Sequence, residues 1–201
     1  PVNLALDLHS GIREIGTALR RPEEFVLRFR DSDDKARKSV ALFPILFANA
    51  VLGLACYGLT MGLHGGADGM LRAAVRAPIA AGAGWTIALP ALYIINTVLG
   101  SRLDARTTTL AALTTVSFGS LAMLASVPIN WFFGITLPYA ATRLIVNLVV
   151  FAGVSVSMVD VFLRIMKALE PDRSRLFALV WLGLVAVIGG ELMILLKVFS
   201  V

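Results

Sequence analysis

Cysteine and histidine are nearly absent from this chain of 201 residues. The single cysteine, Cys56, cannot form an internal disulfide, and its position in an apolar run is typical of a small buried residue. The two histidines, His9 and His64, lie too far apart in the sequence to show the spacing of a metal site. We therefore expect neither a bound metal nor a cofactor.

Charged residues are also scarce. They make up 15% of the chain, whereas a soluble domain carries about a quarter, and 58% of the residues are apolar. The net charge of +5 resembles a nucleic-acid-binding signal, but the Lys and Arg residues lie at the ends of apolar runs, as they do in membrane proteins. The composition therefore predicts one membrane domain, with the lipid bilayer and not nucleic acid as its surroundings.

Motifs of the common enzyme classes are missing as well. The chain contains no GxSxG, Walker, HExxH or CxxC motif and no cluster of carboxylates. The pairs Gly65-Gly66 and Gly189-Gly190 lack the strand–turn–helix surroundings of a phosphate-binding loop. We expect no catalytic residue and predict that the protein is not an enzyme.

Long apolar runs, in contrast, are abundant. A helix needs about 20 apolar residues to cross the hydrocarbon layer of a membrane, and five runs of this kind are present. We predict an all-α, polytopic membrane protein with a five-span domain over residues 39–201. The transmembrane helices are predicted at residues 40–63, 78–100, 107–126, 143–163 and 176–196.

Small residues and prolines predict how these helices pack. The run from Pro78 to Ser101 is uncharged, and Pro90 in its middle removes one backbone hydrogen bond, so we expect a kink there. In the first span, Gly58 and Gly62 have a small-xxx-small spacing, which allows two helices to approach closely.

Two connections between the spans are predicted to lie outside the hydrocarbon layer. The segment 64–76 is expected to be a loop along the membrane interface. The segment 134–141 is too short to cross a membrane, and we interpret it as an interfacial or re-entrant connection.

Residues 1–38 are predicted to be an amphipathic cytoplasmic arm. An apolar stripe along one helical face is formed by Leu4, Leu8, Ile12, Ile15 and Leu19. The arm could bind the membrane surface or a partner, or it could pack beneath the transmembrane helices of its own chain, and the mixed charges on its polar face favour the second interpretation. Because charged residues run throughout the segment, we expect no secretory signal in it.

Two helix starts are predicted near the end of the arm. Proline suits the first helical position and acidic residues suit the first turn, so PEE at residues 22–24 indicates the start of a short helix. The acidic run DSDD at residues 31–34 indicates the N-cap and first turn of a longer helix.

The distribution of Lys and Arg predicts the orientation in the membrane. Five spans place the termini on opposite sides, and fourteen of the eighteen Lys and Arg residues then lie on the side of the N-terminus. The other side holds Arg72, Arg76, Arg143 and Lys197. The positive-inside rule therefore predicts that the N-terminus lies in the cytoplasm and the C-terminus on the opposite side of the membrane.

Polar residues inside the predicted spans are the candidate functional residues, because an ionisable group in a membrane is costly. The candidates for an intramembrane polar network are Arg143, Glu191, Asn147, Asn96 and Asp160. Arg143 and Asn147 share a helix face, and the matched depth of Arg143 and Glu191 predicts an ion pair between them. Mutations of that pair should then be coupled in a double-mutant cycle, although such a pair, like Asn96, could simply fix helix packing. Asp160 is expected to pair with Arg164 one turn away.

Three segments carry a family resemblance. They are YGLTMGLHGG at 57–66, AAVRAPIAAGAGWTIALPALYIINTVLGSRL at 73–103 and LASVPINWFFG at 124–134. Together they resemble a family of uncharacterised bacterial multi-pass membrane proteins that combine a "YG…MG…GG" segment with "K-x-P" and "LPS-x-Y-x-x-N-x-LLG". Arg76 stands where a lysine is common in that family, and Ala91 where a serine is common. In its five spans and cytoplasmic arm the chain also resembles the Yip family of membrane-trafficking proteins. The first resemblance implies a bacterial inner-membrane protein, whose C-terminus would then lie in the periplasm. Neither resemblance implies a catalytic residue.

Three functions agree with these patterns. The first is a non-enzymatic subunit or scaffold that packs against other membrane proteins, as the short loops and small-residue faces indicate. The second is a homo-oligomeric channel or small transporter lined by Asn96, Asn147 and Glu191. The third is membrane shaping or trafficking in the manner of the Yip family, in which the arm of residues 1–38 would act on the bilayer.

Overall fold

The computed structural model of the chain describes residues 16, 20–30, 33–98, 100, 101, 103–172 and 175–198. Within these ranges the chain is helical and contains no strand, so the all-α prediction is confirmed for this part of the protein. The helices are α2 (Pro22–Arg30), α3 (Asp33–Met61), the 3₁₀ helix η1 (Leu63–Gly65), α4 (Gly66–Val98), α5 (Ala105–Ala125), α6 (Val127–Thr136), α7 (Ala140–Leu169) and α8 (Arg175–Leu195). The apolar stripe predicted between residues 4 and 19 lies outside the described residues.

Four of the helices are long and apolar enough to cross a membrane. They cover Phe43–Met61, Leu63–Ile95, Ala105–Ala125 and Ala140–Leu169. The membrane prediction is therefore confirmed at this level. The fifth predicted span corresponds to α8, whose described apolar part, Leu182–Leu195, is shorter than the other four.

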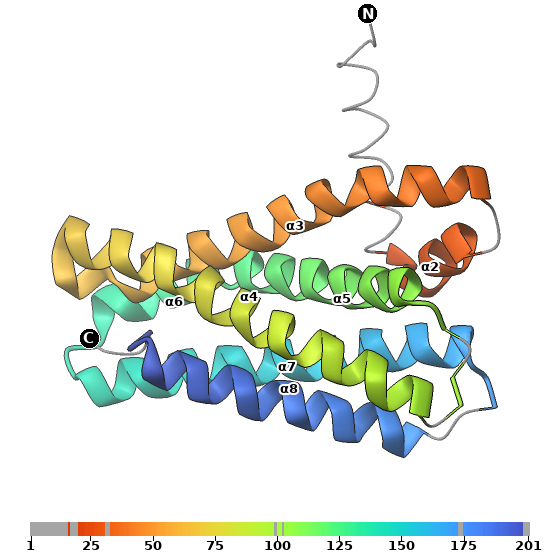
Figure 1. Cartoon of the computed structure of the whole chain (residues 1–201). Coiled ribbons are helices and arrows are strands. Elements are labelled where there is room, and N and C mark those ends of the chain that lie inside the picture. Colours follow the sequence, from red (N-terminus) through yellow and green to blue (C-terminus); the bar gives the residue numbers. More distant parts are fainter. Residues whose placement is uncertain are drawn as a thin grey trace, which may run out of the picture.

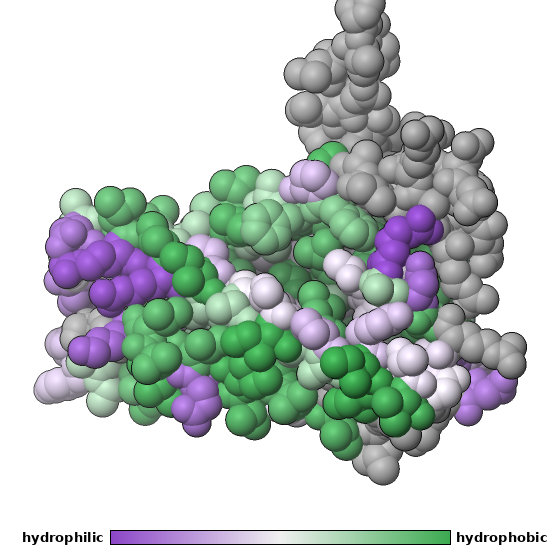
Figure 2. Space-filling model, in the orientation of Figure 1, coloured by the Kyte–Doolittle hydropathy of each residue, from purple (hydrophilic) through white to green (hydrophobic). Residues whose placement is uncertain are grey.

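The long helices lie side by side across the view of Figure 1, and successive long helices run in opposite directions. Helix α3 packs on α4 and α5, α7 packs on α5, and α8 packs mainly on α4. One end of the bundle, called the α2 end here, holds α2, the start of α5 and the end of α7. The opposite end, called the α6 end, holds η1, α6 and the start of α7. Figure 2 shows apolar side chains along the flank between these ends, as expected of a surface that faces lipid.

The segment 64–76, predicted to be a loop, is helical instead. It belongs to η1 and to the first three turns of α4. Gly66 adopts φ 64°, which a glycine tolerates without strain, and it separates the two helices. The sequence that follows is rich in Ala, Leu, Met and Arg, which favour a helix, and this explains why α4 begins twelve residues before the predicted span at 78.

The short helix α2 packs against α7, α3 and α5 at the α2 end. It begins at Pro22 and α3 begins at Asp33, where the acidic runs predict helix starts. Phe25 and Val26 are fully buried in the same apolar cluster as Phe162 of α7. Burial of two large apolar side chains contributes about 3–5 kcal/mol, so α2 is part of the folded bundle.

Glycines allow the closest helix approaches. A Cβ atom at Gly53 would lie 2.4 Å from the carbonyl oxygen of Ser120, at the crossing of α3 and α5. The other close approaches are Gly58 against Ala73, Gly62 against Gly69, and Gly84 against Gly189. Small residues therefore decide where α3 meets α4 and α5, and where α4 meets α8.

Asp104 caps the N-terminus of α5. Its side chain accepts a hydrogen bond from the backbone N–H of Thr107 at 3.0 Å. Partial burial alone would raise the pKa of Asp104, but the hydrogen bonds from Thr107 and the charge of Arg106 outweigh it, so the pKa is lowered.

We expect Asp104→Ala to destabilise the protein by about 1 kcal/mol at neutral pH, because α5 loses its cap. A lowered folded-state pKa contributes stability above the unfolded-state value and loses it as the pH falls through the folded-state pKa. The difference between wild type and variant should therefore shrink below about pH 4. Thermal unfolding in detergent at pH 7 and pH 3 tests this, with Asp104→Asn as a control that keeps a capping oxygen. An equal loss at both pH values would contradict the assignment.

Candidate functional site

Four polar side chains from three helices meet in the interior near the α6 end. Tyr57 and Thr60 come from α3, Asn130 from α6 and Asn147 from α7. The Tyr57 hydroxyl donates to Asn147 Oδ1 at 2.9 Å, and Asn130 Nδ2 donates to Thr60 Oγ1 at 2.7 Å. All four residues are buried. We call this group the α6-end polar cluster.

The hydrogen bonds of the cluster continue into the backbone. Thr60 Oγ1 donates to the carbonyl of Tyr57 at 2.6 Å, and Asn147 Nδ2 donates to the carbonyl of Arg143 at 2.9 Å. The ring of Tyr57 also meets Phe151 edge to face, with the ring centroids 5.7 Å apart. Each buried amide or hydroxyl thus has a partner, which makes the cluster a firm link between α3, α6 and α7.

The local sequence explains how α6 presents Asn130 to this site. Pro128 occupies the first turn of α6, where its missing N–H is not needed. Gly134 lies one turn after Asn130 and leaves room for Leu63, whose Cδ1 would be 3.0 Å from a Cβ at position 134. Segments 57–66 and 124–134, two of the three segments that carry the family resemblance, therefore meet in space at this cluster.

A small cavity lies beside the polar cluster. Its volume of about 20 Å³ is enough for one water molecule. It is lined by Thr60, Met61, His64, Asn130, Phe133, Gly134, Arg143, Val146 and Asn147. A site of this size can hold a bridging water but no organic substrate.

The ion pairs of the described residues do not include the predicted pair of Arg143 and Glu191. Arg143 Nη1 donates to the carbonyls of Leu137 and Pro138, at 3.1 Å each. These carbonyls lie in the extended turn before α7, where no helical N–H reaches them, so they offer a nearby acceptor for the guanidinium.

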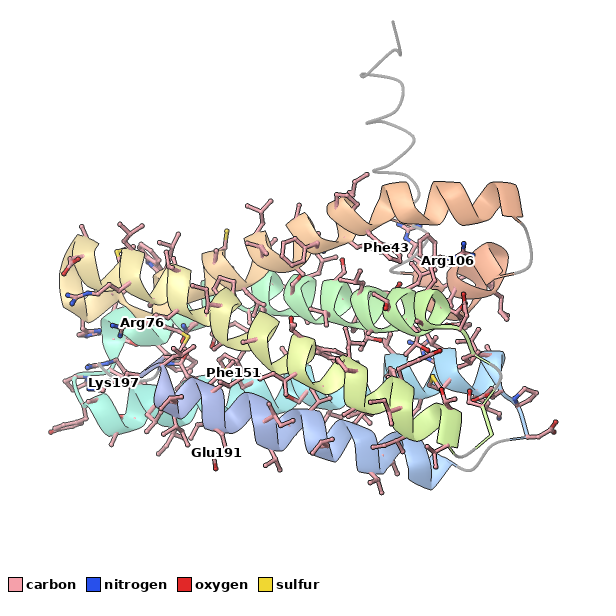
Figure 3. The ribbon with its side chains drawn as sticks, in the orientation of Figure 1. Phe43, Arg76, Arg106, Phe151, Glu191 and Lys197 are labelled. Atoms are coloured by element: carbon pink, nitrogen blue, oxygen red, sulfur yellow. The ribbon has the colours of Figure 1, made fainter. Side chains whose placement is uncertain are left out.

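Glu191 lies on the opposite side of α8 from the helix face that packs on the bundle. It follows the buried Leu182 by nine residues, about two and a half helical turns. Figure 3 shows its side chain pointing away from the other helices. Among the described residues Glu191 makes no ion pair, and the side chains sharing its face, Val187, Ile194 and Leu195, are apolar and exposed.

The remaining predicted residues lie apart from the polar cluster. Asp160 pairs with Arg164 at 3.1 Å, and Arg164 also lies 3.9 Å from Glu23 of α2, so this group joins α7 to α2 at the α2 end. The side chain of Asn96 lies outside the described residues. Pro90 lies inside α4, which continues as one helix, and the kink there stays a prediction.

Sequence patterns did not predict the polar contacts that α3 makes with α5 and α6. Asn49 Nδ2 donates to Ser117 Oγ at 2.6 Å, and Ser120 Oγ donates to the carbonyl of Asn49 at 3.1 Å, beside the close approach at Gly53. The sequence feature that could have indicated these contacts is the large number of Ser and Thr residues in α5. Several of these residues are buried and donate back to a carbonyl of their own helix, such as Thr114 and Thr115.

A larger apolar cavity of about 340 Å³ lies between α4, α5, α7 and α8. Trp85, Phe151 and Met193 form part of its wall, and Ser120 and Ser155 are its only hydroxyl groups among the described residues. Neither Asn147 nor Glu191 lines it. Asn147 and Glu191, two of the residues predicted to line a channel, therefore do not share this cavity.

The described residues include no group of three or more His, Cys, Asp or Glu side chains that could hold a metal ion. Comparisons add no relative: no protein-family model, no curated protein and no solved structure matches this chain. Both family resemblances therefore stay predictions.

Proposed function

We propose that this protein is a non-enzymatic integral membrane subunit that binds another membrane protein through the outer face of α8. The observation that supports this is the position of Glu191 on a surface otherwise made of exposed aliphatic side chains. A carboxylate that faces lipid is costly, and a cationic or hydrogen-bond-donating side chain from a partner helix would remove that cost.

The partner helix would lie along the face of α8 that holds Val187, Glu191 and Ile194. These three residues lie three or four positions apart and so form one stripe. Gly183 and Gly190 flank the stripe, and a Cβ atom at either position would meet nothing, so a second helix could approach closely. We expect the partner to present Lys or Arg at the depth of Glu191.

The proposal includes five spans in a bacterial inner membrane, with the N-terminus in the cytoplasm. The helices α3, α4, α5 and α7 have spanning length, and α8 lies antiparallel beside α4 as a fifth span would. The α2 end carries the basic connections between spans, which supports its cytoplasmic position under the positive-inside rule.

We expect Glu191→Gln to weaken the complex with the partner about tenfold or more, because the charge that the partner neutralises is gone. Gentle detergent extraction of the whole chain from native membranes, followed by native mass spectrometry, measures the bound fraction. Asp172→Asn is the matched control, since it removes an exposed carboxylate in the turn between α7 and α8.

Cross-linking locates the contact on the proposed face. In a Cys56→Ser background, Ile194→Cys should cross-link to the partner, whereas Val156→Cys, equally exposed on α7, should not. A wild-type chain that extracts as a monomer, or a complex that is unchanged by Glu191→Gln, would overturn the proposal.

A homo-oligomeric channel or small transporter is the second candidate, because copies of α8 could bring several Glu191 carboxylates together around one axis. A complex of fixed size made only of this chain would favour it, and ion flux in liposomes that falls with Glu191→Gln would establish it. A Yip-like role in membrane shaping rests on the arm of residues 1–38, and curvature-dependent binding of the protein, lost on deletion of the arm, would support it.

A further inference from the structure

A third cavity, distinct from the polar cluster and from the apolar cavity, opens at the α6 end. Its volume is about 270 Å³, and its wall consists of Met61, Gly62, Gly65, Gly69, Arg72, Ala73, Arg76 and Lys197. The wall thus joins the α3–α4 connection to the turn after α8. Figure 2 shows a hydrophilic patch over the start of α4, and Figure 3 shows Arg76 and Lys197 on that side of the bundle. We call this cavity the basic pocket.

Every charged side chain in the described wall of the basic pocket is cationic. Arg72, Arg76 and Lys197 line it, and no Asp or Glu is among the described residues of its wall. Asp68 forms an ion pair with Arg72 on the exposed side of α4. In the described part of the chain, Arg76 makes no ion pair. Cations held together at the edge of a low-dielectric membrane repel one another, and an anion between them would relieve that repulsion.

Glycines create the space for such an anion. Gly65 borders this space, because a Cβ there would meet nothing within 4 Å, whereas Gly62 and Gly69 are in close contact with each other. A liquid water molecule takes up about 30 Å³, so 270 Å³ can hold a phosphate group together with some of its hydration.

The pocket lies at the level expected for lipid headgroups. Lys197 is two residues past Leu195, the last residue of the apolar helix α8. Beneath it, Ala77 and Val198 form a buried apolar cluster, to which Met61 contributes. The cations therefore mark the boundary between the apolar flank of the bundle and water.

An aliphatic stripe leads from the pocket along the outside of α4. Leu71, Val75 and Ile79 are four residues apart and are 63%, 50% and 54% exposed. Arg72 and Arg76 each follow a member of this stripe by one residue. A ligand that combines a phosphate with acyl chains fits both surfaces at once, whereas a free phosphate uses only the first.

We propose that the basic pocket binds the phosphate of an anionic phospholipid in the leaflet next to the α6 end, with the acyl chains along the outer face of α4. Arg76 and Lys197 hold the phosphate, and Arg72 contributes while keeping its pair with Asp68. The proposal is independent of Glu191 and of any protein partner, because neither contributes to the pocket.

The test uses the full chain in detergent with phosphatidylglycerol or phosphatidylcholine of identical acyl chains, and native mass spectrometry measures the bound lipid. The wild type should retain phosphatidylglycerol in preference to phosphatidylcholine. The double variant Arg76→Gln/Lys197→Gln should bind phosphatidylglycerol about 30-fold more weakly, since each cation at an anionic membrane surface contributes about fivefold. Lys167→Gln, which removes an exposed cation at the α2 end, should leave the preference unchanged.

A charge-preserving double variant, Arg76→Lys/Lys197→Arg, separates charge from folding and should retain the preference. Equal binding of the two lipids to the wild type, or unchanged phosphatidylglycerol binding to the glutamine variant, would overturn the proposal. Complete displacement of the lipid by inorganic phosphate at millimolar concentration would also overturn it, because the pocket would then be a site for a soluble anion.

Discussion

Replacing Gly53 by alanine is expected to destabilise the bundle by about 3 kcal/mol, at the upper end of the range for overpacked interiors. The added Cβ would lie 2.4 Å from the carbonyl oxygen of Ser120 and 2.8 Å from its carbonyl carbon. Because both atoms belong to the backbone of α5, no side-chain rotation can make room, and α3 and α5 must separate. That movement would also stretch the hydrogen bonds from Asn49 to Ser117 and from Ser120 to Asn49.

Thermal unfolding in detergent, monitored by tryptophan fluorescence, measures this effect. The Tm should fall by about 6–12 °C. Gly153→Ala is the matched control, since Gly153 lies in the middle of α7 and a Cβ there meets nothing within 4 Å. That variant should be neutral or slightly more stable, because alanine favours a helix over glycine. Equal stability of the two variants would contradict the close contact between Gly53 of α3 and the Ser120 backbone of α5.

Breaking the hydrogen bond between Tyr57 and Asn147 should produce the second large effect. Tyr57→Phe leaves Asn147 Oδ1 without its donor, and Asn147→Leu leaves the buried Tyr57 hydroxyl without its acceptor. Each single variant should lose about 1–2 kcal/mol, since an unsatisfied buried polar group has no water to replace its partner. The double variant should lose less than the sum, with a coupling energy of about 1 kcal/mol.

Tyr139→Phe is the control for the tyrosine substitution, because Tyr139 is 72% exposed and its hydroxyl lies outside the polar cluster. Its Tm should stay within about 1–2 °C of the wild type. Strictly additive losses in the Tyr57 and Asn147 variants would mean that the cluster does not join α3 to α7.

Local sequence is enough to predict that the protein is a helical membrane protein and to predict where several helices begin. A run of apolar residues long enough to cross a membrane has few alternatives to a helix, because every backbone group must find its hydrogen bond within the segment. Capping chemistry is equally local, and so α2 begins at Pro22 and α3 at Asp33 as expected. Local sequence predicts the start of α4 too late, because Asp68, Arg72 and Arg76 interrupt the apolar run and hydropathy does not distinguish a charged helical segment from a loop.

The position of a side chain around its helix depends on which face packs, and only the tertiary structure decides that. Arg143 and Glu191 were matched by depth, yet Glu191 lies on the far side of α8 because Leu182 and Gly189 face the bundle. The alternation of buried and exposed positions along α8 contains this information, but its use requires knowledge of the neighbouring helix.

The sequence by itself therefore determined that this chain is a helical membrane protein with its charges gathered at the helix ends. The tertiary structure alone decided that Tyr57, Thr60, Asn130 and Asn147 form one cluster, and that Arg76 and Lys197 share one pocket. The physical reason is range: backbone hydrogen bonding and hydropathy act within a few residues. Contacts between residues about 70 to 120 positions apart depend on where small residues let the helices cross.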